Sequence, residues 1–258
     1  MALRLLGEPP IDIHAGGIDL LFPHHENEIA QSEGATGQPF SRFWVHVEHL
    51  FVEHEKMSKS IGNVHTLPDV VARGYRPSAL RYLLLSSHYR KQLNFTWAGM
   101  EQAEESLRRI VDFLVRLDTV RGDASQGDVA AMVTRAREAF RKALESDLNT
   151  AAALAAVFDL VSDGNTAIDA KRMSTSDAAL IRDAIDEFDR VLGVVSLRRA
   201  EDAAVPDELV REIEQLVEER RAAKQRRDFA TADHIRKTLA DRGILLEDSP
   251  TGTRWKKK

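Results

Sequence analysis

The sequence predicts an α/β segment over its first hundred residues, then a helical bundle and a small α+β domain. Most of the glycine, proline and histidine residues stand in that first segment, among short strand-like and helical runs. From Leu107 onward the apolar residues follow helical spacing, i, i+3, i+4 and i+7. The last sixty residues add two further helical stripes and then two short extended pieces around a turn.

Strands are predicted in two places in the α/β segment. Residues 11–14 alternate apolar and polar side chains and run into two glycines, and residues 44–52 form a second strand candidate. Between them, Pro23 suits the first turn of a helix that carries residues 24–31. A strand, a helix and a strand in this order are typical of an α/β fold.

Two breaks divide the helical part of the chain. Residues 121–128 are polar and contain glycine, so we expect a domain boundary or a long loop there. A second break is expected at 198–206. The elements that follow are helices over 209–217 and 229–239, the second ended by Gly243, and a turn at 248–252 between two extended pieces.

Composition sets limits on the function. The 258 residues include no cysteine, which excludes a disulfide framework and a thiolate ligand from this chain. No run approaches the ~18–20 apolar residues that a spanning helix needs, so we expect a cytoplasmic protein. The formal charge is −5, yet residues 220–258 hold twelve Lys or Arg against five Asp or Glu. This basic end either contacts phosphates or is a solvated charged helix.

Two short motifs carry candidate chemistry. His24 and Glu28 stand four apart on the predicted helix, where an imidazole and a carboxylate can hold one metal ion or form an ordinary surface pair. The second motif is Lys56-Met57-Ser58-Lys59-Ser60, whose ammonium and hydroxyl groups can bind a polyphosphate and stabilise the charge on departing pyrophosphate.

With both motifs in place, residues 11–63 resemble the cysteinyl-tRNA synthetases, a class I family whose KMSKS loop is the second motif. The resemblance continues to the C-terminal end, through residues 81–82, 87–90, 147–150, 243–248 and 252–255. It implies the later part of a Rossmann-like class I synthetase catalytic domain, an α-helical anticodon-binding bundle and a small α+β C-terminal domain. The domains expected are 1–95 (catalytic part), 96–122 (connecting, stem-contact helix), 123–198 (bundle) and 199–258 (anticodon recognition).

The resemblance also implies roles for residues of the catalytic part. His24 and Glu28 would bind a zinc ion that takes the thiolate of substrate cysteine, which separates cysteine from serine. Asp19 would face the amino group of the substrate, with His14 nearby. The residues expected to contact ATP are Lys59, supported by Lys56, and the hydroxyls of Ser58 and Ser60. Mg²⁺ is expected as a cofactor beside ATP.

The basic C-terminal end would then bind tRNA-Cys. Arg226 and Arg227 offer phosphate contacts, and Asp248 can accept a hydrogen bond from a base edge. Arg254 and Trp255 stand beside the final turn, where an unstacked base could lie on the indole ring. Trp255 could equally be a hydrophobic plug of a small domain.

The chain departs from the family in one respect. The family places two cysteine ligands of zinc and a His-Ile-Gly-His nucleotide motif before the segment that Met1 begins, and this chain contains neither. We therefore expect an N-terminal sheet that lacks neighbours and a chain that is inactive alone, completed by a missing N-terminal half. His24 and Glu28 would form a partial zinc site or have no present task.

The function expected is that of a cysteine–tRNA ligase, of which this chain is the C-terminal portion. One alternative is a noncatalytic tRNA-binding paralogue, which the missing motif favours and the intact loop at 56–60 disfavours. The other is a cysteine ligase that acts on a small amine, which the long C-terminal region argues against.

Overall fold

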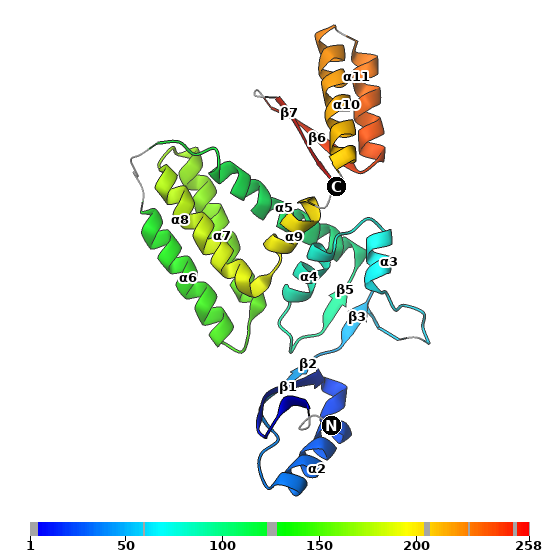
Figure 1. Ribbon diagram of the computed structural model, residues 1–258, viewed down its shortest axis with the longest axis vertical. Coiled ribbons are helices and arrows are strands. Elements are labelled where there is room, and N and C mark those ends of the chain that lie inside the picture. Colours follow the sequence, from blue (N-terminus) through cyan, green and yellow to red (C-terminus); the bar gives the residue numbers. More distant parts are fainter. Residues whose placement is uncertain are drawn as a thin grey trace. The chain divides into compact units, whose positions relative to one another are not determined.

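A computed structural model describes residues 5–58, 60–122, 128–203, 207–226, 228–249 and 252–257. The chain divides into two compact units, Met1–Val195 and Ser196–Lys258, each with its own hydrophobic cluster. Figure 1 shows the first unit from blue through green to yellow and the second from yellow through orange to red. The finer domain boundaries expected after residues 95, 122 and 198 stay predictions.

The first unit opens with a βαβ arrangement. β1 (Ile11–Gly17) and β2 (Ser41–Val47) pair in parallel, and α2 (Glu26–Thr36) lies on the connection between them (Figure 1). The strand predicted at 11–14 is confirmed. The helix begins at Glu26, two residues later than predicted, because Leu21–His25 form a wider turn around Pro23.

The second predicted strand, 44–52, is wrong as one element. β2 ends at Val47, and β3 (Leu50–Val52) belongs to another sheet, in the order β4 (Glu55–Lys56), β3, β5 (Leu93–Phe95). The chain changes sheets at Glu48, whose amide donates to the carbonyl of Tyr89 instead of to a strand partner. The short helices α3 (Leu67–Ala72) and α4 (Pro77–Leu85) lie between β4 and β5 in the chain.

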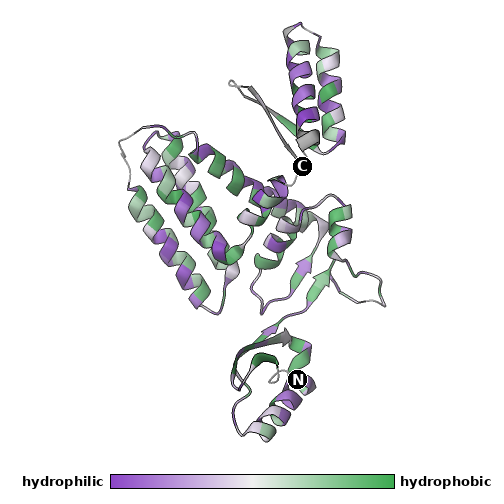
Figure 2. Cartoon of the chain, in the orientation of Figure 1, coloured by the Kyte–Doolittle hydropathy of each residue, from purple (hydrophilic) through white to green (hydrophobic). Residues whose placement is uncertain are grey.

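A helical bundle completes the first unit. Its helices are α5 (Trp97–Leu117), α6 (Val129–Glu145), α7 (Thr150–Asp169) and α8 (Thr175–Leu192). The predicted stripe is confirmed, since Leu107, Ile110 and Leu114 are buried in the core. These helices carry hydrophobic and hydrophilic stripes (Figure 2), as expected for helices that share a core. The predicted break falls between α5 and α6, although residues 123–127 lie outside the described part.

Helix α7 is long and apolar enough to cross a membrane by length and composition alone. Its side chains nevertheless belong to the core of the bundle. Leu154, Val157, Leu160 and Val161 are buried against the neighbouring helices. We therefore interpret α7 as the central helix of the bundle.

The second unit is an α-hairpin followed by a β-hairpin. The predicted helices are confirmed as α10 (Asp207–Gln225) and α11 (Phe229–Asp241), and Gly243 follows with the left-handed φ of +75°. The predicted extended pieces are β6 (Ile244–Ser249) and β7 (Gly252–Lys257), paired antiparallel. The break predicted at 198–206 is wrong in its first part, because α9 (Val195–Ala203) occupies it.

Candidate functional site

The principal candidate site lies on one face of the β1–β2 sheet. Register pairs His14 with Trp44 and Gly16 with His46, so that these positions share a face. His25 is buried against this face, and a side chain at Gly16 would collide with its imidazole, 2.8 Å away. Imidazoles therefore gather here, where most proteins would place apolar side chains.

Helix α2 adds a carboxylate to these imidazoles. Glu28 Oε2 lies 2.9 Å from His14 Nε2 and 3.7 Å from His24 Nε2. This oxygen is buried, yet it forms no hydrogen bond with the described residues. An unsatisfied buried acceptor costs about 1–3 kcal/mol, and more when charged, so the oxygen is suited to a positive partner.

His25 is held in one orientation. Its Nδ1 lies 2.8 Å from Nε2 of His46, so one ring donates a hydrogen bond to the other. Burial lowers the pKa of His25 below its usual range, and the imidazoles of His14 and His46 lower it further. The lowered pKa favours the neutral imidazole, which is the form that binds metals.

Three donors in this cluster suit a metal ion. Donor atoms of His14, His25 and Glu28 all lie within 4.8 Å of one another. Two imidazoles and one carboxylate are a set that zinc uses where one coordination position stays open. His24, which the family resemblance implies as a ligand, has a side chain 59% exposed and is not part of this group. The assignment of zinc to His24 and Glu28 therefore stays a prediction.

Asp19 lies at the end of β1, in a short helical turn formed by Ile18–Leu20. It is exposed, and its carboxylate folds back over Gly17, where a side chain would collide with it. Asp19 is therefore near the histidine cluster in the sequence, but its carboxylate is not part of the group formed by His14, His25 and Glu28.

The side chain of Asn63 holds the loop that carries Lys56, Ser58 and Ser60 through two hydrogen bonds to its backbone. Asn63 Oδ1 accepts from the amide of Ser58 at 2.8 Å, and Asn63 Nδ2 donates to the carbonyl of Lys56 at 3.2 Å. The hydroxyls of Ser58 and Ser60 lie 3.0 Å apart. Lys59 lies outside the described residues. The sequence reasoning missed the role of Asn63, although an Asn after a glycine is a turn signal.

The predicted tRNA residues of the second unit are partly described. Arg226 is exposed at the end of α10, whereas Arg227 and the side chains of Asp248 and Arg254 lie outside the described part. Trp255 is half-buried and packs against the core residues of the unit. This packing favours the plug over the free stacking platform.

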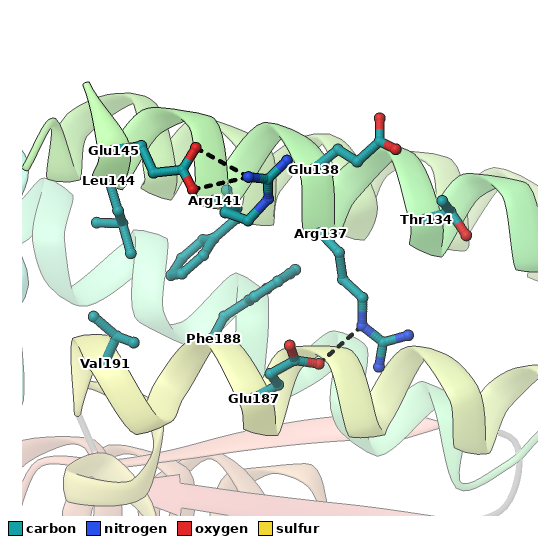
Figure 3. Close-up of a pocket in the computed structure, with 10 residues that line it drawn as sticks. Thr134, Arg137, Glu138, Arg141, Leu144, Glu145, Glu187, Phe188 and Val191 are labelled. Carbon is teal, nitrogen blue, oxygen red and sulfur yellow. Dashed lines mark hydrogen bonds and ion pairs between the residues drawn. The ribbon is translucent and has the colours of Figure 1, made fainter.

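A separate hollow of about 530 Å³ lies between α6 and α8 (Figure 3). The rings of Phe140 and Phe188 line it and stack on each other, with their centroids 4.3 Å apart. Arg137 pairs with Glu187, and Arg141 pairs with a carboxylate on its own helix. Because these guanidinium groups are already paired, the hollow is a poor phosphate site.

Three family models match the chain in succession. They are the class I (C) tRNA synthetase catalytic domain over residues 1–105, the DALR domain over 139–196 and the cysteinyl-tRNA ligase anticodon binding domain over 207–255. Each matched region corresponds to a part of the fold described above. The matches bear out the expected class of catalytic domain, helical bundle and C-terminal domain.

Curated relatives match this chain over its whole length. A cysteine–tRNA ligase of Solibacter usitatus (strain Ellin6076) is 47% identical over 100% of this chain and 54% of its own length. The cysteine–tRNA ligase of Protochlamydia amoebophila (strain UWE25) is 43% identical over 100% of this chain and 53% of its own length. The chain thus spans about half the length of these relatives.

Two solved structures are similar in fold. The first is the agnB2 LeuRS of Agrobacterium radiobacter K84 in a ternary complex with tRNA and LeuAMS, with a TM-score of 0.58, 21% identity and coverage of 73% of this chain and 27% of that one. The second is the methionyl-tRNA synthetase of Mycobacterium tuberculosis bound by methionyl-adenylate, with a TM-score of 0.50, 18% identity and coverage of 72% and 40%. From the succession of three domain matches and the similarity of the whole chain to about half the length of its curated relatives, this chain matches the C-terminal half of the cysteine–tRNA ligases.

Proposed function

We propose that this chain is the C-terminal half of a cysteine–tRNA ligase and acts with the polypeptide that corresponds to the other half of its relatives. A carboxylate oxygen of cysteine attacks the α-phosphorus of ATP, and pyrophosphate leaves. A hydroxyl at the 3′ end of tRNA-Cys then attacks the carbonyl carbon of the adenylate, and AMP leaves. The observation that carries this proposal is the succession of catalytic, DALR and anticodon-binding matches in one chain.

The loop at 56–63 would serve the first step. Lys56, together with Lys59, brings positive charge to the departing pyrophosphate, and the hydroxyls of Ser58 and Ser60 donate to phosphate oxygens. Asn63 joins both ends of the turn through its side chain, so the loop keeps its shape while no nucleotide is bound. Mg²⁺ accompanying ATP and a cytoplasmic location are parts of this proposal.

The histidine cluster would receive the cysteine. His14 lies beside Trp44, with their ring centroids 4.8 Å apart, and Asp19 follows at the end of the same strand, where its carboxylate could pair with an ammonium group. A zinc ion, when bound, supplies a soft acceptor for the cysteine thiolate, which a serine hydroxyl does not match.

The other half of the enzyme would cover the outer face of the β1–β2 sheet. On this face Ile13 and Phe43 are paired by register and are 63% and 66% exposed, and Val47 is also exposed. A sheet of parallel strands is normally covered on both faces. The relatives are about twice as long as this chain, which supplies the polypeptide needed for that cover.

Binding of tRNA tests the proposal directly. We expect the purified chain to bind tRNA-Cys and to lose affinity when the anticodon is altered. Arg226→Ala should weaken binding and lower its salt dependence, because one phosphate contact is lost. Arg221→Ala is the matched control, since its guanidinium group already pairs with Glu218 at 2.8 Å. Weak binding that ignores the anticodon would contradict the proposal.

Complementation tests the division into halves. The chain alone should give no cysteine-dependent ATP–pyrophosphate exchange, and addition of the N-terminal half of the Solibacter usitatus relative should produce exchange. Phe43→Asp should prevent this gain by placing a charge on the apolar face. Exchange by the chain alone would show that the other half is not required.

The alternatives receive no support from these observations. A ligase acting on a small amine has no use for the anticodon-binding region that matches residues 207–255. A noncatalytic tRNA-binding paralogue would have no need of the turn that Asn63 closes around Ser58.

A further inference from the structure

We propose that Glu53 and Asn94 are positioning residues for the loop at 56–63, which they anchor, together with Trp97, to the first turn of α5. The inference rests on the proposed function, because it concerns how this loop is placed for the phosphates of ATP. Both residues act through the backbone that leads into Lys56, without touching a substrate themselves.

The turn that leads into the loop has an uncommon backbone. Val52 of β3 pairs with Glu55 of β4, so Glu53 and His54 alone join the two strands. Both residues have left-handed backbone, with φ of +49° and +70°. Two-residue hairpins require this conformation and favour asparagine and glycine for it, whereas glutamate and histidine adopt it at a cost in free energy. The turn therefore depends on contacts outside itself.

Strand β5 supplies two of these contacts. The amide of Glu53 donates to the carbonyl of Phe95 at 2.9 Å, and the amide of His54 donates to Asn94 Oδ1 at 2.8 Å. Asn94 Nδ2 also lies 3.1 Å from Nδ1 of His54. The side chain of Asn94 thus contacts both the backbone and the ring of the residue with the larger positive φ.

The first turn of α5 supplies a third contact. Glu53 Oε1 accepts a hydrogen bond from the amide of Trp97, the first residue of this helix, at 3.1 Å. The amides of a first helical turn have no partner inside the helix, and the helix dipole also stabilises a carboxylate there. Because α5 is 21 residues long and one side of it is buried in the core of the bundle, it gives the turn a fixed point of attachment.

Trp97 also contacts the far end of the loop. The centroid of its ring lies 5.0 Å from that of His65, which follows the loop in the chain. Tyr75 stacks on the same indole, and the guanidinium of Arg73 lies 4.0 Å from its centroid. The segments before and after the loop, at Glu53 and His65, therefore meet one residue at the start of α5.

This double attachment determines where Lys56 can lie. Misplacement of a catalytic group by about 1 Å can cost about 10²-fold in rate. The histidine cluster lies on the separate β1–β2 sheet. We therefore expect loosened anchors to impair the use of ATP and to leave the binding of cysteine unchanged.

Amide hydrogen exchange of the full-length chain tests the anchors without any enzymatic activity. The amides to follow are those of Met57, Ser58 and Gly62, which donate hydrogen bonds in the structure. We expect Glu53→Ala and Asn94→Ala each to lower their protection roughly 2–10-fold, as the loss of one hydrogen bond predicts. The amides of α7 should keep their protection.

Matched variants separate positioning from general destabilisation. Glu53→Gln and Asn94→Asp keep the accepting oxygen and should retain most of the protection. Glu105→Ala removes an exposed glutamate of α5 that pairs with Arg108, and it should leave the loop unchanged. His54→Gly should also leave the loop protected, because its amide still reaches Asn94 and glycine adopts a φ of +70° freely.

Exchange kinetics give the functional readout. Cysteine-dependent ATP–pyrophosphate exchange is measured after addition of the N-terminal half of the Solibacter usitatus relative. Glu53→Ala and Asn94→Ala should lower kcat/KM for ATP at least ~10-fold while the KM for cysteine stays unchanged. Glu53→Gln and Asn94→Asp should restore most of the activity.

Two results would overturn the inference. One is unchanged protection of the loop amides in both alanine variants, with circular dichroism showing that they are folded. The other is a KM for cysteine that rises as much as the KM for ATP, because the substitutions would then disturb the whole fold. If even the wild-type chain gives no exchange activity with the other half, the proposed function fails, and the hydrogen-exchange result still decides whether the anchors hold the loop.

Discussion

The N-terminal sheet and the helical bundle distribute their apolar side chains in opposite ways. In the bundle, Phe113 and Ile181 point inward and are at most 1% exposed. In the β1–β2 sheet, the apolar Ile13 and Phe43 face solvent, while the titratable His14 and His25 lie between the sheet and the start of α2. The bundle is complete in its own core, whereas the sheet presents a surface that suits a further protein layer.

The two regions differ in this way because the bundle is held together by its apolar core, whereas the inner face of the sheet carries the candidate site. The helices of the bundle gain stability from burying apolar area, at about 25 cal/mol per Å². The inner face of the sheet instead carries imidazole side chains, which contribute little to stability until each has a hydrogen-bond or ionic partner. We therefore expect substitutions of the same type to have very different effects in the two regions.

The largest expected effect is at Phe113. Phe113→Ala leaves a cavity in the core of the bundle, and it should lower the free energy of unfolding by about 3–5 kcal/mol. Urea unfolding followed by far-ultraviolet circular dichroism measures this change.

Phe43→Ala is the matched comparison in the sheet. Because Phe43 is 66% exposed, this substitution should change the stability of the chain by less than about 0.5 kcal/mol. A loss as large as that of Phe113→Ala would mean that Phe43 is covered in solution, and the contrast between the regions would fail.

An intermediate effect is expected where two helices of the bundle approach closely. A Cβ atom at Gly164 of α7 would lie 2.5 Å from Cζ of Phe113. Gly164→Ala should therefore destabilise the chain by about 1–3 kcal/mol despite the better helix propensity of alanine. Combining it with Phe113→Leu should recover part of the loss, because the smaller side chain leaves room. Two effects that simply add would show that the two positions do not touch.

The bundle could be predicted from the sequence much better than the candidate site. The spacing of Leu107, Ile110 and Leu114 depends on a period that any amphipathic helix must follow, and the structure buries all three. By contrast, the single strand predicted at 44–52 was wrong, because apolar content alone does not show where a chain passes from one sheet to the next. That change depends on a bond between Glu48 and Tyr89, which are far apart in the sequence.

The cluster of His14, His25 and Glu28 illustrates the same limit. The i, i+4 rule identified His24 and Glu28, which lie close in the sequence. The imidazoles of His14 and His25 approach Glu28 only through the parallel register of β1 with β2 and the wide turn before α2. The alternation of His14 with Ile13, and of His46 with Val47, was a usable signal once the parallel pairing was known.

The smallest expected effect concerns the junction between the bundle and the segment before it. Asp147, in the loop after α6, accepts hydrogen bonds from Arg90 Nε and the hydroxyl of Tyr89, each at 2.6 Å. The bond from Arg90, followed by that from Tyr89, lowers the pKa of Asp147 below its ordinary value of 3.8. The junction therefore depends on an ionised carboxylate.

Because the pKa of Asp147 is lower in the folded chain than in the unfolded one, its contribution to stability is present above the ordinary pKa and is lost as the pH falls through the folded pKa. Asp147→Asn should accordingly be less stable than the wild type near neutral pH and equally stable in acid. Asparagine tolerates the left-handed φ of +57° at this position, so the variant removes the charge without adding backbone strain. Unfolding midpoints of the wild type and the variant, measured from neutral pH down to acid, give the difference in stability. A gap between the two proteins that persists in acid would mean that Asp147 acts through its shape and not its charge.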